Sequence, residues 1–243
     1  MIEITNLRKC YKNAIAVSSA SFVAPDGLVT GLLGPNGAGK TTALRAISGL
    51  LKHDAGGVKV DGLDVSLDPP GVRKRLGVLP EVVGLYDHLT VREHLVYAGE
   101  LHGLAVEPLK RQVDILLDRF ALLPLGARRA STLSLGQKRR VAMARVLVHE
   151  PANVVLDEPT NGLDVLSARE VRREVRRLAD SGRAVLFSSH VMPEVSAVCD
   201  RIIVMSKGLV VAAGTPAEIM ARAGGASLED AFVKLIGSDE GLN

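Results

Sequence analysis

Short apolar runs recur along the chain and are the clearest predictors of its strands. Ile2–Leu7 alternates apolar and polar residues, which is typical of a strand with one buried face. Ala152–Leu156 and Ala184–Phe187 are continuously apolar, as buried parallel strands are. The last two strands flank Lys207-Gly208 and form a predicted hairpin. The pattern predicts strands at residues 2–7, 19–24, 28–33, 56–61, 152–156, 184–187, 202–205 and 209–213.

From about residue 90 to residue 150 the pattern changes to helical periodicity, with little strand character. Leu95, Leu101 and Leu104 mark one predicted helix. A second predicted helix has its apolar residues at positions 109, 113, 116, 117 and 120. Because strands and helices alternate again after residue 150, we predict a helical subdomain, at about residues 85–150, inserted into an α/β core.

Two further helices are predicted near the C-terminus. Thr215-Pro216-Ala217-Glu218 has the form of a capping box, with Thr as N-cap, Pro at the first helical position and Glu at the third. Leu228–Ile236 is a final amphipathic segment. We predict a core domain over residues 1–220, with its helical insertion, and a helical tail over residues 221–243.

A helix is also predicted between the strands at 152–156 and 184–187, with Val171, Val175 and Leu178 on one face. Arginines lie mostly off that face, at positions 172, 173, 176 and 177. They leave two interpretations, a helix that binds nucleic acid or a solvated, ion-paired surface. Glu170 and Glu174 lie among the arginines and favour the ion-paired surface.

Composition narrows the choice of partner. The formal net charge is +3, from 30 basic and 27 acidic residues, which does not argue for nucleic acid. No window approaches the roughly 20 continuous apolar residues of a membrane-spanning helix, and Met1-Ile2-Glu3-Ile4 is unlike a signal peptide. Cys10 and Cys199 lack metal-binding spacing and are expected to be reduced thiols. We therefore expect a soluble chain whose membrane role, if any, comes through a partner.

The most specific motif is Gly34-Pro35-Asn36-Gly37-Ala38-Gly39-Lys40-Thr41, followed by Thr42. It fits the phosphate-binding P-loop, and it lies between a predicted strand and a predicted helix. Its glycines permit a tight turn that brings backbone N–H groups onto a polyphosphate, next to a positive helix end. Lys40 is expected to reach the β- and γ-phosphates, and the Thr41 hydroxyl is expected to bind Mg²⁺. The alternative is a glycine-rich turn that binds nothing.

A second candidate group follows the strand at 152–156, where Asp157 and Glu158 stand side by side. Neighbouring strand residues face opposite ways, so the two acids need not share a role. Asp157 can hold the Mg²⁺ water shell, and Glu158 can polarise a water in line with the γ-phosphate. The same pair could simply end a strand and cap a helix, but the P-loop upstream favours the metal-and-base interpretation.

The remaining motifs resemble those of the ATP-binding cassette (ABC) ATPases. Residues 133–137, Leu-Ser-Leu-Gly-Gln, are similar to the family's LSGGQ signature and lie where the family carries it, between the P-loop and the Asp-Glu pair. Leu135 replaces the first signature glycine. Residues 161–164, Asn-Gly-Leu-Asp, resemble the D-loop. His190 matches the switch histidine, and Tyr11 matches the aromatic residue that stacks on adenine.

This resemblance covers roughly residues 1–220 and implies a P-loop NTPase of the ABC ATPase type, with an antiparallel β subdomain and an inserted α-helical subdomain. It implies an ATPase that uses ATP and Mg²⁺. Glu158 and His190 are the expected catalytic residues. The resemblance and the P-loop together give these expected nucleotide contacts: Tyr11, Gly34, Pro35, Asn36, Gly37, Ala38, Gly39, Lys40, Thr41, Thr42, Ser134, Gly136, Gln137 and Asp164. Because a lone domain has its signature on the wrong side of its own nucleotide, the motifs imply a head-to-tail dimer.

One position departs from the family. The family places a glutamine, which supplies a neutral oxygen to Mg²⁺, where this chain has Glu81. The expected metal ligands are therefore Thr41, Glu81 and Asp157. Either the carboxylate changes metal binding, or an oxygen of any kind suffices at this position.

A finer resemblance concerns the cargo. Residues 84–90, 161–165 and 227–232 are similar to those of the ATPase subunits of bacterial sodium-efflux ABC exporters. This implies sodium export through a separately encoded membrane permease, with the chain at the cytoplasmic face of the bacterial plasma membrane and no nucleic-acid partner. Export of drugs or polysaccharides is the alternative. A soluble, non-transport ABC ATPase is less favoured, because such proteins usually carry two cassettes or a long coiled-coil insertion.

Overall fold

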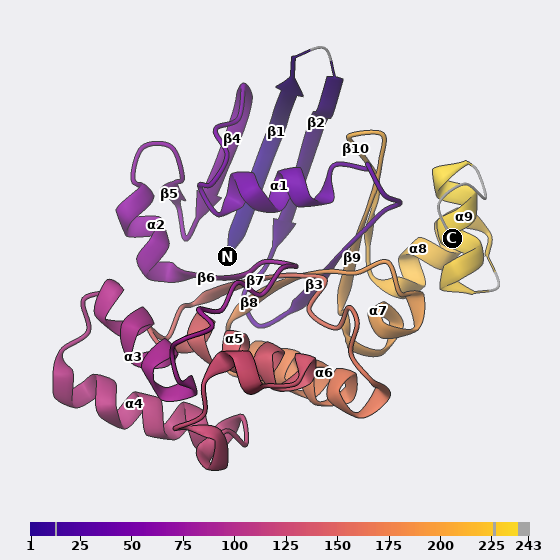
Figure 1. Ribbon diagram of the computed structural model, residues 1–243. Coiled ribbons are helices and arrows are strands. Elements are labelled where there is room, and N and C mark those ends of the chain that lie inside the picture. The colour runs from indigo at the N-terminus through magenta and orange to yellow at the C-terminus, as the bar shows by residue number, and fades with distance from the viewer. Residues whose placement is uncertain (13, 226, 238–243) are drawn as a thin grey trace.

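The computed structural model describes residues 1–12, 14–225 and 227–237, and it is built on one ten-stranded sheet (Figure 1). The strand order is β5-β4-β1-β2-β10-β9-β3-β8-β7-β6. The strands are β1 (Ile2–Tyr11), β2 (Ala14–Ala24), β3 (Val29–Leu33), β4 (Ala55–Val60), β5 (Leu63–Asp64), β6 (Leu76–Leu79), β7 (Asn153–Asp157), β8 (Ala184–Ser188), β9 (Arg201–Ser206) and β10 (Leu209–Gly214).

The sheet has two parts that differ in strand direction. Strands β5, β4, β1 and β2 pair antiparallel, and β9, β3, β8, β7 and β6 pair parallel. β10 joins the two parts, because it pairs antiparallel with β9 and parallel with β2 at Leu209 and Ser19. Strands β3, β7 and β8 are buried along their whole length, as expected for the centre of a parallel sheet.

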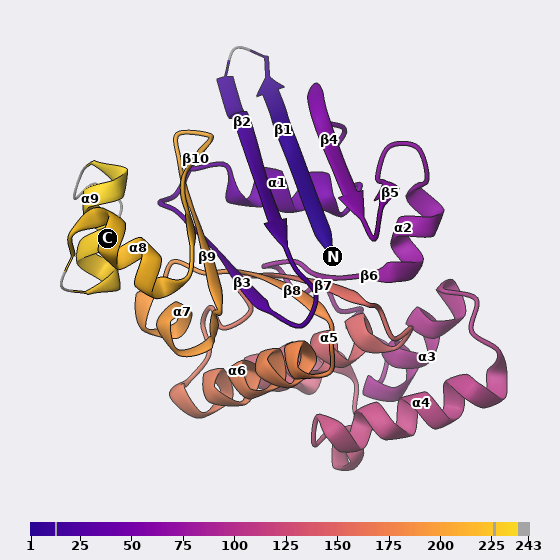
Figure 2. The same cartoon turned by 180° about the vertical axis from the view of Figure 1, so that it is seen from behind.

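Helices cover both sides of the parallel part (Figures 1 and 2). They are α1 (Lys40–Ile47), α2 (Pro69–Arg75), α3 (Val91–Leu101), α4 (Val106–Arg119), α5 (Leu135–Leu147), α6 (Val165–Asp180), α7 (Met192–Val198), α8 (Pro216–Ala223) and α9 (Leu228–Ile236), with short 3₁₀ turns at Leu123–Leu125 and Ala130–Thr132. None of the helices within the described ranges combines the length and the hydropathy needed to span a bilayer.

Two hydrophobic cores hold these layers together. One core lies around α1, where Leu44 and Ile47 pack with Ile4 of β1 and Val155 of β7. The other lies on the opposite face of the parallel strands, where Val154 and Leu156 of β7 and Val185 and Phe187 of β8 pack with apolar residues of α3 to α6. Helix α1 therefore lies between the antiparallel strands and the parallel strands, and it fixes the P-loop that precedes it against both.

The eight predicted strands are confirmed, with shifted ends. β1 and β2 are longer than predicted because they form one antiparallel ladder as far as Tyr11 and Ala14. Residues 90–150 contain helices and no named strand, as the periodicity predicts. The pattern of apolar and polar residues does not predict β5, β6, α2 and α7. Helix α8 spans residue 220, where a domain boundary is predicted. The division into a core domain at residues 1–220 and a tail at residues 221–243 stays a prediction. Residues 238–243 of that tail lie outside the described residues.

Arg172, Arg176 and Arg177 of α6 form ion pairs, as predicted for an ion-paired surface. Arg172 binds Glu194 at 3.0 Å, and Arg176 binds Asp180 at 2.9 Å and Asp200 at 2.8 Å. Glu174 is buried and pairs with Arg119 of α4. The helix is therefore attached to its neighbours by charge as well as by its apolar face.

A stacked pair of histidines lies where α5 meets β6. The rings of His102 and His149 are parallel, with centroids 3.6 Å apart, and Nε2 of His149 lies 3.3 Å from the Leu76 carbonyl oxygen. Burial, and then the neighbouring His102, lowers the pKa of His149 from 6.5 to about 4. The folded protein therefore keeps His149 neutral at pH values where the unfolded chain binds a proton.

We expect the free energy of unfolding to fall as the pH drops from 6.5 towards 4, because protons then bind the unfolded chain preferentially. At pH 5 the expected loss from His149 is about 1–2 kcal/mol, after allowance for partial solvent screening. Urea unfolding at pH 7 and pH 5 measures it, and His149→Gln should reduce the difference. His88→Gln, at an exposed site, is the matched control. An equal pH effect in wild type and His149→Gln would contradict the assignment.

Candidate functional site

The P-loop lies at the end of β3 and surrounds a pocket of about 220 Å³. The pocket is lined by Ala16 of β2 and by residues 35–42. Helix α1 begins at this pocket, with Gly39 as its N-cap residue and no side chain capping the helix. The first N–H groups of α1 are therefore left for a ligand, and a helix N-terminus of this kind favours anions.

Two of the P-loop glycines are required by the packing of the loop. Gly39 has φ +101, and a Cβ atom there would lie 2.6 Å from the Ala16 carbonyl oxygen. A Cβ atom at Gly34 would lie 2.4 Å from the Met205 carbonyl oxygen. A side chain at either position would displace the loop from the neighbouring strands, so the glycines set the shape of the pocket.

Lys40 lies at the floor of this site with 8% of its surface exposed. Its ammonium donates a hydrogen bond to the Gly34 carbonyl oxygen at 2.6 Å. Burial lowers its pKa below the usual value, and three carboxylates oppose that shift, in decreasing order those of Glu158, Asp157 and Glu81. The structure thus brings the P-loop lysine and the predicted acids together, although they come from separate parts of the chain.

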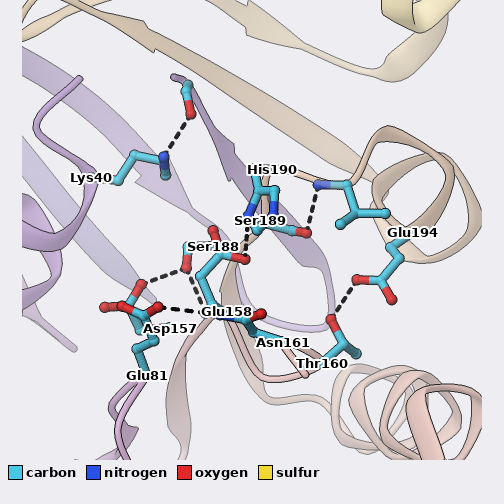
Figure 3. A network of polar contacts seen from close by, with 12 residues as sticks. Lys40, Glu81, Asp157, Glu158, Thr160, Asn161, Ser188, Ser189, His190 and Glu194 are labelled. Atoms are coloured by element: carbon cyan, nitrogen blue, oxygen red, sulfur yellow. Dashed lines mark hydrogen bonds and ion pairs between the residues drawn. The ribbon is translucent and has the colours of Figure 1, made fainter. Parts of the chain in front are cut away.

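Asp157 and Glu158 lie at the carboxyl end of the buried strand β7, and both side chains are buried. Asp157 is the last residue of the strand and Oδ1 accepts a hydrogen bond from Ser188 Oγ at 2.6 Å. Glu158 has φ +46, which side-chain-bearing residues rarely adopt. The strand alternation therefore stops at Asp157, and both acids contact the same network (Figure 3).

His190 lies beside the second acid, Glu158. It follows β8, and its Nδ1 atom lies 3.0 Å from Glu158 Oε2. The His190 side chain is 56% exposed and that of Glu158 only 11%. An imidazole on the solvent side and a carboxylate on the buried side thus face each other at the carboxyl ends of two neighbouring parallel strands.

Glu81 is also at this site. It follows β6, and its Oε1 atom accepts a hydrogen bond from Asn161 Nδ2 at 3.3 Å. Its carbonyl oxygen accepts a hydrogen bond from Arg139 of α5 at 3.2 Å. The side chain is exposed and points towards the carboxylate of Asp157 (Figure 3). Glu81 therefore links β6, the signature helix α5 and the D-loop.

The three predicted metal ligands line one pocket. Thr41, Glu81 and Asp157 come from α1, from the loop after β6 and from β7, and they share a pocket of about 150 Å³. Among the described residues, no three His, Cys, Asp or Glu side chains form a metal-binding group by themselves. A hydroxyl and two carboxylates are the hard oxygen donors that suit Mg²⁺, which commonly takes substrate phosphates as its other ligands.

The signature residues lie at the start of α5 and form a capping box. Ser134 Oγ accepts from the Gln137 N–H at 3.3 Å, and Gln137 Oε1 accepts from the Ser134 N–H at 2.9 Å. A Cβ atom at Gly136 would lie 2.8 Å from Ser167 Oγ. None of the residues that line the P-loop pocket belongs to the signature. The structure therefore does not bring the signature to this chain's own P-loop pocket.

Asp164 and Tyr11, the other two predicted nucleotide contacts, have neighbours of their own. Asp164 caps α6, because its two carboxylate oxygens accept hydrogen bonds from Ser167 N and Oγ at 2.9 and 2.8 Å. Tyr11 ends β1, is 43% exposed, and has the Lys9 ammonium 5.6 Å from its ring centre. A nucleotide contact for either residue stays a prediction.

Sequence reasoning missed the polar residue that holds the acids in place. Ser188 binds both Asp157 and Glu158. The available signal is the pair Ser188-Ser189, which interrupts an apolar strand just before His190. Ser189 accepts a hydrogen bond from the Val191 N–H at 3.0 Å, and a buried Ser188 also needs a partner, but the sequence alone does not say which residue that partner is.

Comparison with known proteins agrees with this arrangement. The family model described as ABC transporter matches residues 17–161. The ABC transporter ATP-binding protein NatA of Bacillus subtilis is 42% identical over 200 residues, which cover 82% of this chain and 81% of that protein. The linearmycin resistance ATP-binding protein LnrL of the same organism is 35% identical over 225 residues, 93% of this chain and 72% of that protein.

Solved structures lead to the same conclusion. A structure of an ATP-binding subunit of an ABC transporter superposes with a TM-score of 0.89 and 30% sequence identity, and it covers 97% of this chain and 99% of that one. The predicted fold, an α/β P-loop core with an antiparallel part and a helical insertion, is thereby confirmed. The chain belongs to the ABC transporter family and is an ATPase subunit of that family.

Proposed function

We propose that this ATPase powers export through a separately encoded membrane permease, at the cytoplasmic face of the bacterial plasma membrane. The observation that carries the proposal is the convergence of Lys40, Asp157, Glu158 and His190 beside a pocket formed by the P-loop. A buried cation can neutralise phosphate charge, a buried carboxylate can activate the attacking water, and an imidazole beside it can donate a hydrogen bond to the γ-phosphate.

The proposed chemistry is positioning and charge stabilisation. Glu158 takes the proton of the attacking water as the bond from that water to the γ-phosphorus forms and the bond to the β–γ bridging oxygen breaks. Lys40 neutralises charge on the phosphate oxygens. His190 hydrogen-bonds the γ-phosphate and the water, and its contact with Glu158 keeps the base and the imidazole in one orientation.

Mg²⁺ is proposed to be held by Thr41, Asp157 and Glu81, the residues that line one pocket beside the P-loop. When bound, it supplies positive charge that neutralises the phosphate oxygens. In this chain Glu81 adds a second carboxylate beside Asp157, so the protein contributes more negative charge than a neutral glutamine would.

Replacing Glu81 by Gln is expected to weaken the dependence of ATP binding on Mg²⁺ and to improve the binding of metal-free ATP. Because Glu81 is exposed, the expected change is about 1 kcal/mol, or about fivefold in affinity. Titration of ATP affinity against Mg²⁺ measures it, with Glu107→Gln, at an exposed position of α4, as the matched control. Superimposable curves for wild type and Glu81→Gln would leave Glu81 with no role at the metal.

A head-to-tail homodimer is proposed for the ATP-bound state. The signature residues Ser134 and Gly136 do not line the P-loop pocket of their own chain, so a second copy is the source from which they could cover the γ-phosphate. Asp164 lies beside the signature, because Ser167 contacts both segments. In the dimer Asp164 and Gln137 would face the nucleotide of the partner copy.

A groove between α1, β6 and the helical insertion supports a membrane partner. It has a volume of about 340 Å³ and is lined by residues of α2, α3, α5 and β6. Leu50, Tyr86, Tyr97 and Leu101 line it and are exposed. Exposed apolar side chains gathered around a groove mark an interaction site, and we propose the permease as its occupant. The segment between β6 and α3, which carries Glu81, would transmit the nucleotide state to that partner.

Sodium is the proposed cargo. Its support is the resemblance of residues 84–90, 161–165 and 227–232 to sodium-efflux ATPase subunits. The name of LnrL, a relative at 35% identity, refers instead to resistance to linearmycin. Overall identity therefore does not select a cargo, and drug or polysaccharide export is the alternative that the experiment must separate.

Deletion of the gene for this chain is expected to make cells accumulate sodium and become sensitive to salt. Complementation with the wild-type chain should restore growth, and Glu158→Gln should not, because export then lacks its energy source. Intracellular sodium is measured directly at increasing external sodium chloride. Normal sodium handling combined with hypersensitivity to a drug would move the assignment to a drug exporter.

A further inference from the structure

Ser188, the last residue of β8, lies between the two acids of the site with none of its surface exposed. We infer that Ser188 is a positioning residue for ATP hydrolysis, which orients the carboxylate of Asp157 and the backbone of Glu158 through one hydroxyl group. The inference rests on the proposed roles of those two acids. It adds a residue that belongs to none of the motifs discussed above.

The sheet itself places Ser188 there. β7 and β8 are neighbouring parallel strands, and Asp157 is the direct partner of Ser188 at the end of that ladder. The two residues are 31 positions apart in the chain. Beyond this pair both strands end, and the chain turns into the loops that carry Glu158 and His190. Ser188 is therefore the last fixed point of the sheet before the reacting groups.

A hydroxyl group can serve both acids at once because it has one hydrogen and two lone pairs. Ser188 Oγ donates to Asp157 Oδ1 at 2.6 Å and accepts from the Glu158 N–H at 2.8 Å. The first bond fixes the carboxylate of the proposed metal ligand. The second holds the backbone of the proposed base, so a single atom sets the position of one acid relative to the other (Figure 3).

The backbone of Glu158 needs such a contact. Its φ of +46 lies in the left-handed region, which is unfavourable for a residue with a side chain. The peptide is held on both sides of this residue, by Ser188 at the Glu158 N–H and by the Asn161 N–H at the Glu158 carbonyl oxygen, 3.1 Å away. Loss of the Ser188 bond would leave a buried N–H without a partner and allow the base to move.

Burial of a hydroxyl is not by itself a sign of function, and β3 supplies the comparison. Thr30 lies on the strand next to β8, is also fully buried, and its Oγ1 atom has no hydrogen-bond partner within the described part of the chain. Replacement of Thr30 by the isosteric Val removes a buried hydroxyl that orients nothing. It is therefore the matched control for Ser188.

The test is the steady-state ATPase kinetics of Ser188→Ala, measured with ATP and with Mg²⁺ as the varied component. We expect kcat to fall about 10- to 100-fold and the half-saturating Mg²⁺ concentration to rise about tenfold, the range seen when an outer-shell partner of a metal ligand is lost. The KM for ATP should stay within about twofold, because the P-loop is unchanged. Ser188→Thr, which keeps the hydroxyl, should restore most of kcat, and Thr30→Val should match wild type.

The outcomes separate this inference from the proposed function. Unchanged kcat and unchanged Mg²⁺ dependence in a folded Ser188→Ala protein would overturn the inference, provided that Glu158→Gln is inactive in the same assay. An active Glu158→Gln would instead remove the proposed role of Glu158. If Ser188→Ala does not fold, Ser188→Cys takes its place with the same expectations, because a thiol has a similar volume and is a weaker hydrogen-bonding group. If Thr30→Val lost as much kcat as Ser188→Ala, the inference that Ser188 orients the two acids would also be overturned.

Discussion

Replacing Glu158 by Gln is expected to leave ATP binding intact and to slow hydrolysis by roughly a hundredfold or more, the scale of losing a general base. Gln has the size of Glu and can still accept a hydrogen bond from His190, whose Nδ1 lies 3.0 Å from Glu158 Oε2. It cannot take a proton from the attacking water. Lys40 and the P-loop are unchanged, so ATP should still bind with near wild-type affinity.

The variant also tests the proposed dimer. Because ATP binds but is not consumed, the protein should accumulate as an ATP-bound dimer, which light scattering during gel filtration detects. Glu170→Gln, the same substitution at an exposed position of α6, should hydrolyse ATP normally. A Glu158→Gln protein with near wild-type turnover would exclude Glu158 as the base. An inactive Glu158→Gln protein that stays monomeric with saturating ATP would count against the proposed dimer but not against Glu158 as the base.

The sequence predicts the P-loop well because every residue of that pocket except Ala16 comes from one continuous segment. The strand before it is buried throughout and the helix after it starts at Lys40. The segment that predicts the strand, the turn and the helix is therefore the same segment that forms the pocket. Asp157 is predicted for a similar reason. An apolar strand ends there in an acid, and ligands of α/β proteins bind at the carboxyl ends of the parallel strands.

Strand β6 shows where pattern reasoning stops. Its four residues, Leu76–Leu79, follow two prolines and a basic segment, and they are too few to show a period. What makes them a strand is the parallel ladder with β7, from Leu76 opposite Asn153 to Leu79 opposite Leu156. The position of Glu81 depends on that ladder, so only the resemblance, and not the pattern, could place it at the site.

The contacts between acids and their supports could not be predicted either. Ser188 is adjacent to Asp157 only because β7 and β8 are neighbours in the sheet. The positive φ of Glu158 has no sequence signal, since glycine or asparagine is the usual marker of that conformation. The sequence motifs predict which groups react at this site, whereas the groups that orient them become visible only once the sheet order is known.

Replacing Lys40 by Ala is expected to have the largest effect on nucleotide affinity. Lys40 is buried and lies within the field of three carboxylates, those of Glu158, Asp157 and Glu81. Truncating one partner of a buried charge pair between protein and ligand costs about 3 kcal/mol of binding free energy, so ATP should bind about a hundredfold more weakly. Calorimetric titration with ATP measures the loss, and Lys52→Ala, at an exposed lysine, is the matched control.

The loss in Lys40→Ala should be greater without Mg²⁺ than with it. Without the lysine, the carboxylates of Glu158, Asp157 and Glu81 lose the buried cation that offsets their charge, and they repel the triphosphate unless a metal lies between them. Lys40→Arg keeps the charge, but its planar guanidinium differs in shape from the ammonium that donates to the Gly34 carbonyl oxygen. It should therefore recover only part of the affinity. Affinity within about threefold of wild type for Lys40→Ala would exclude Lys40 as the phosphate ligand, since a charge-assisted hydrogen bond contributes more than that.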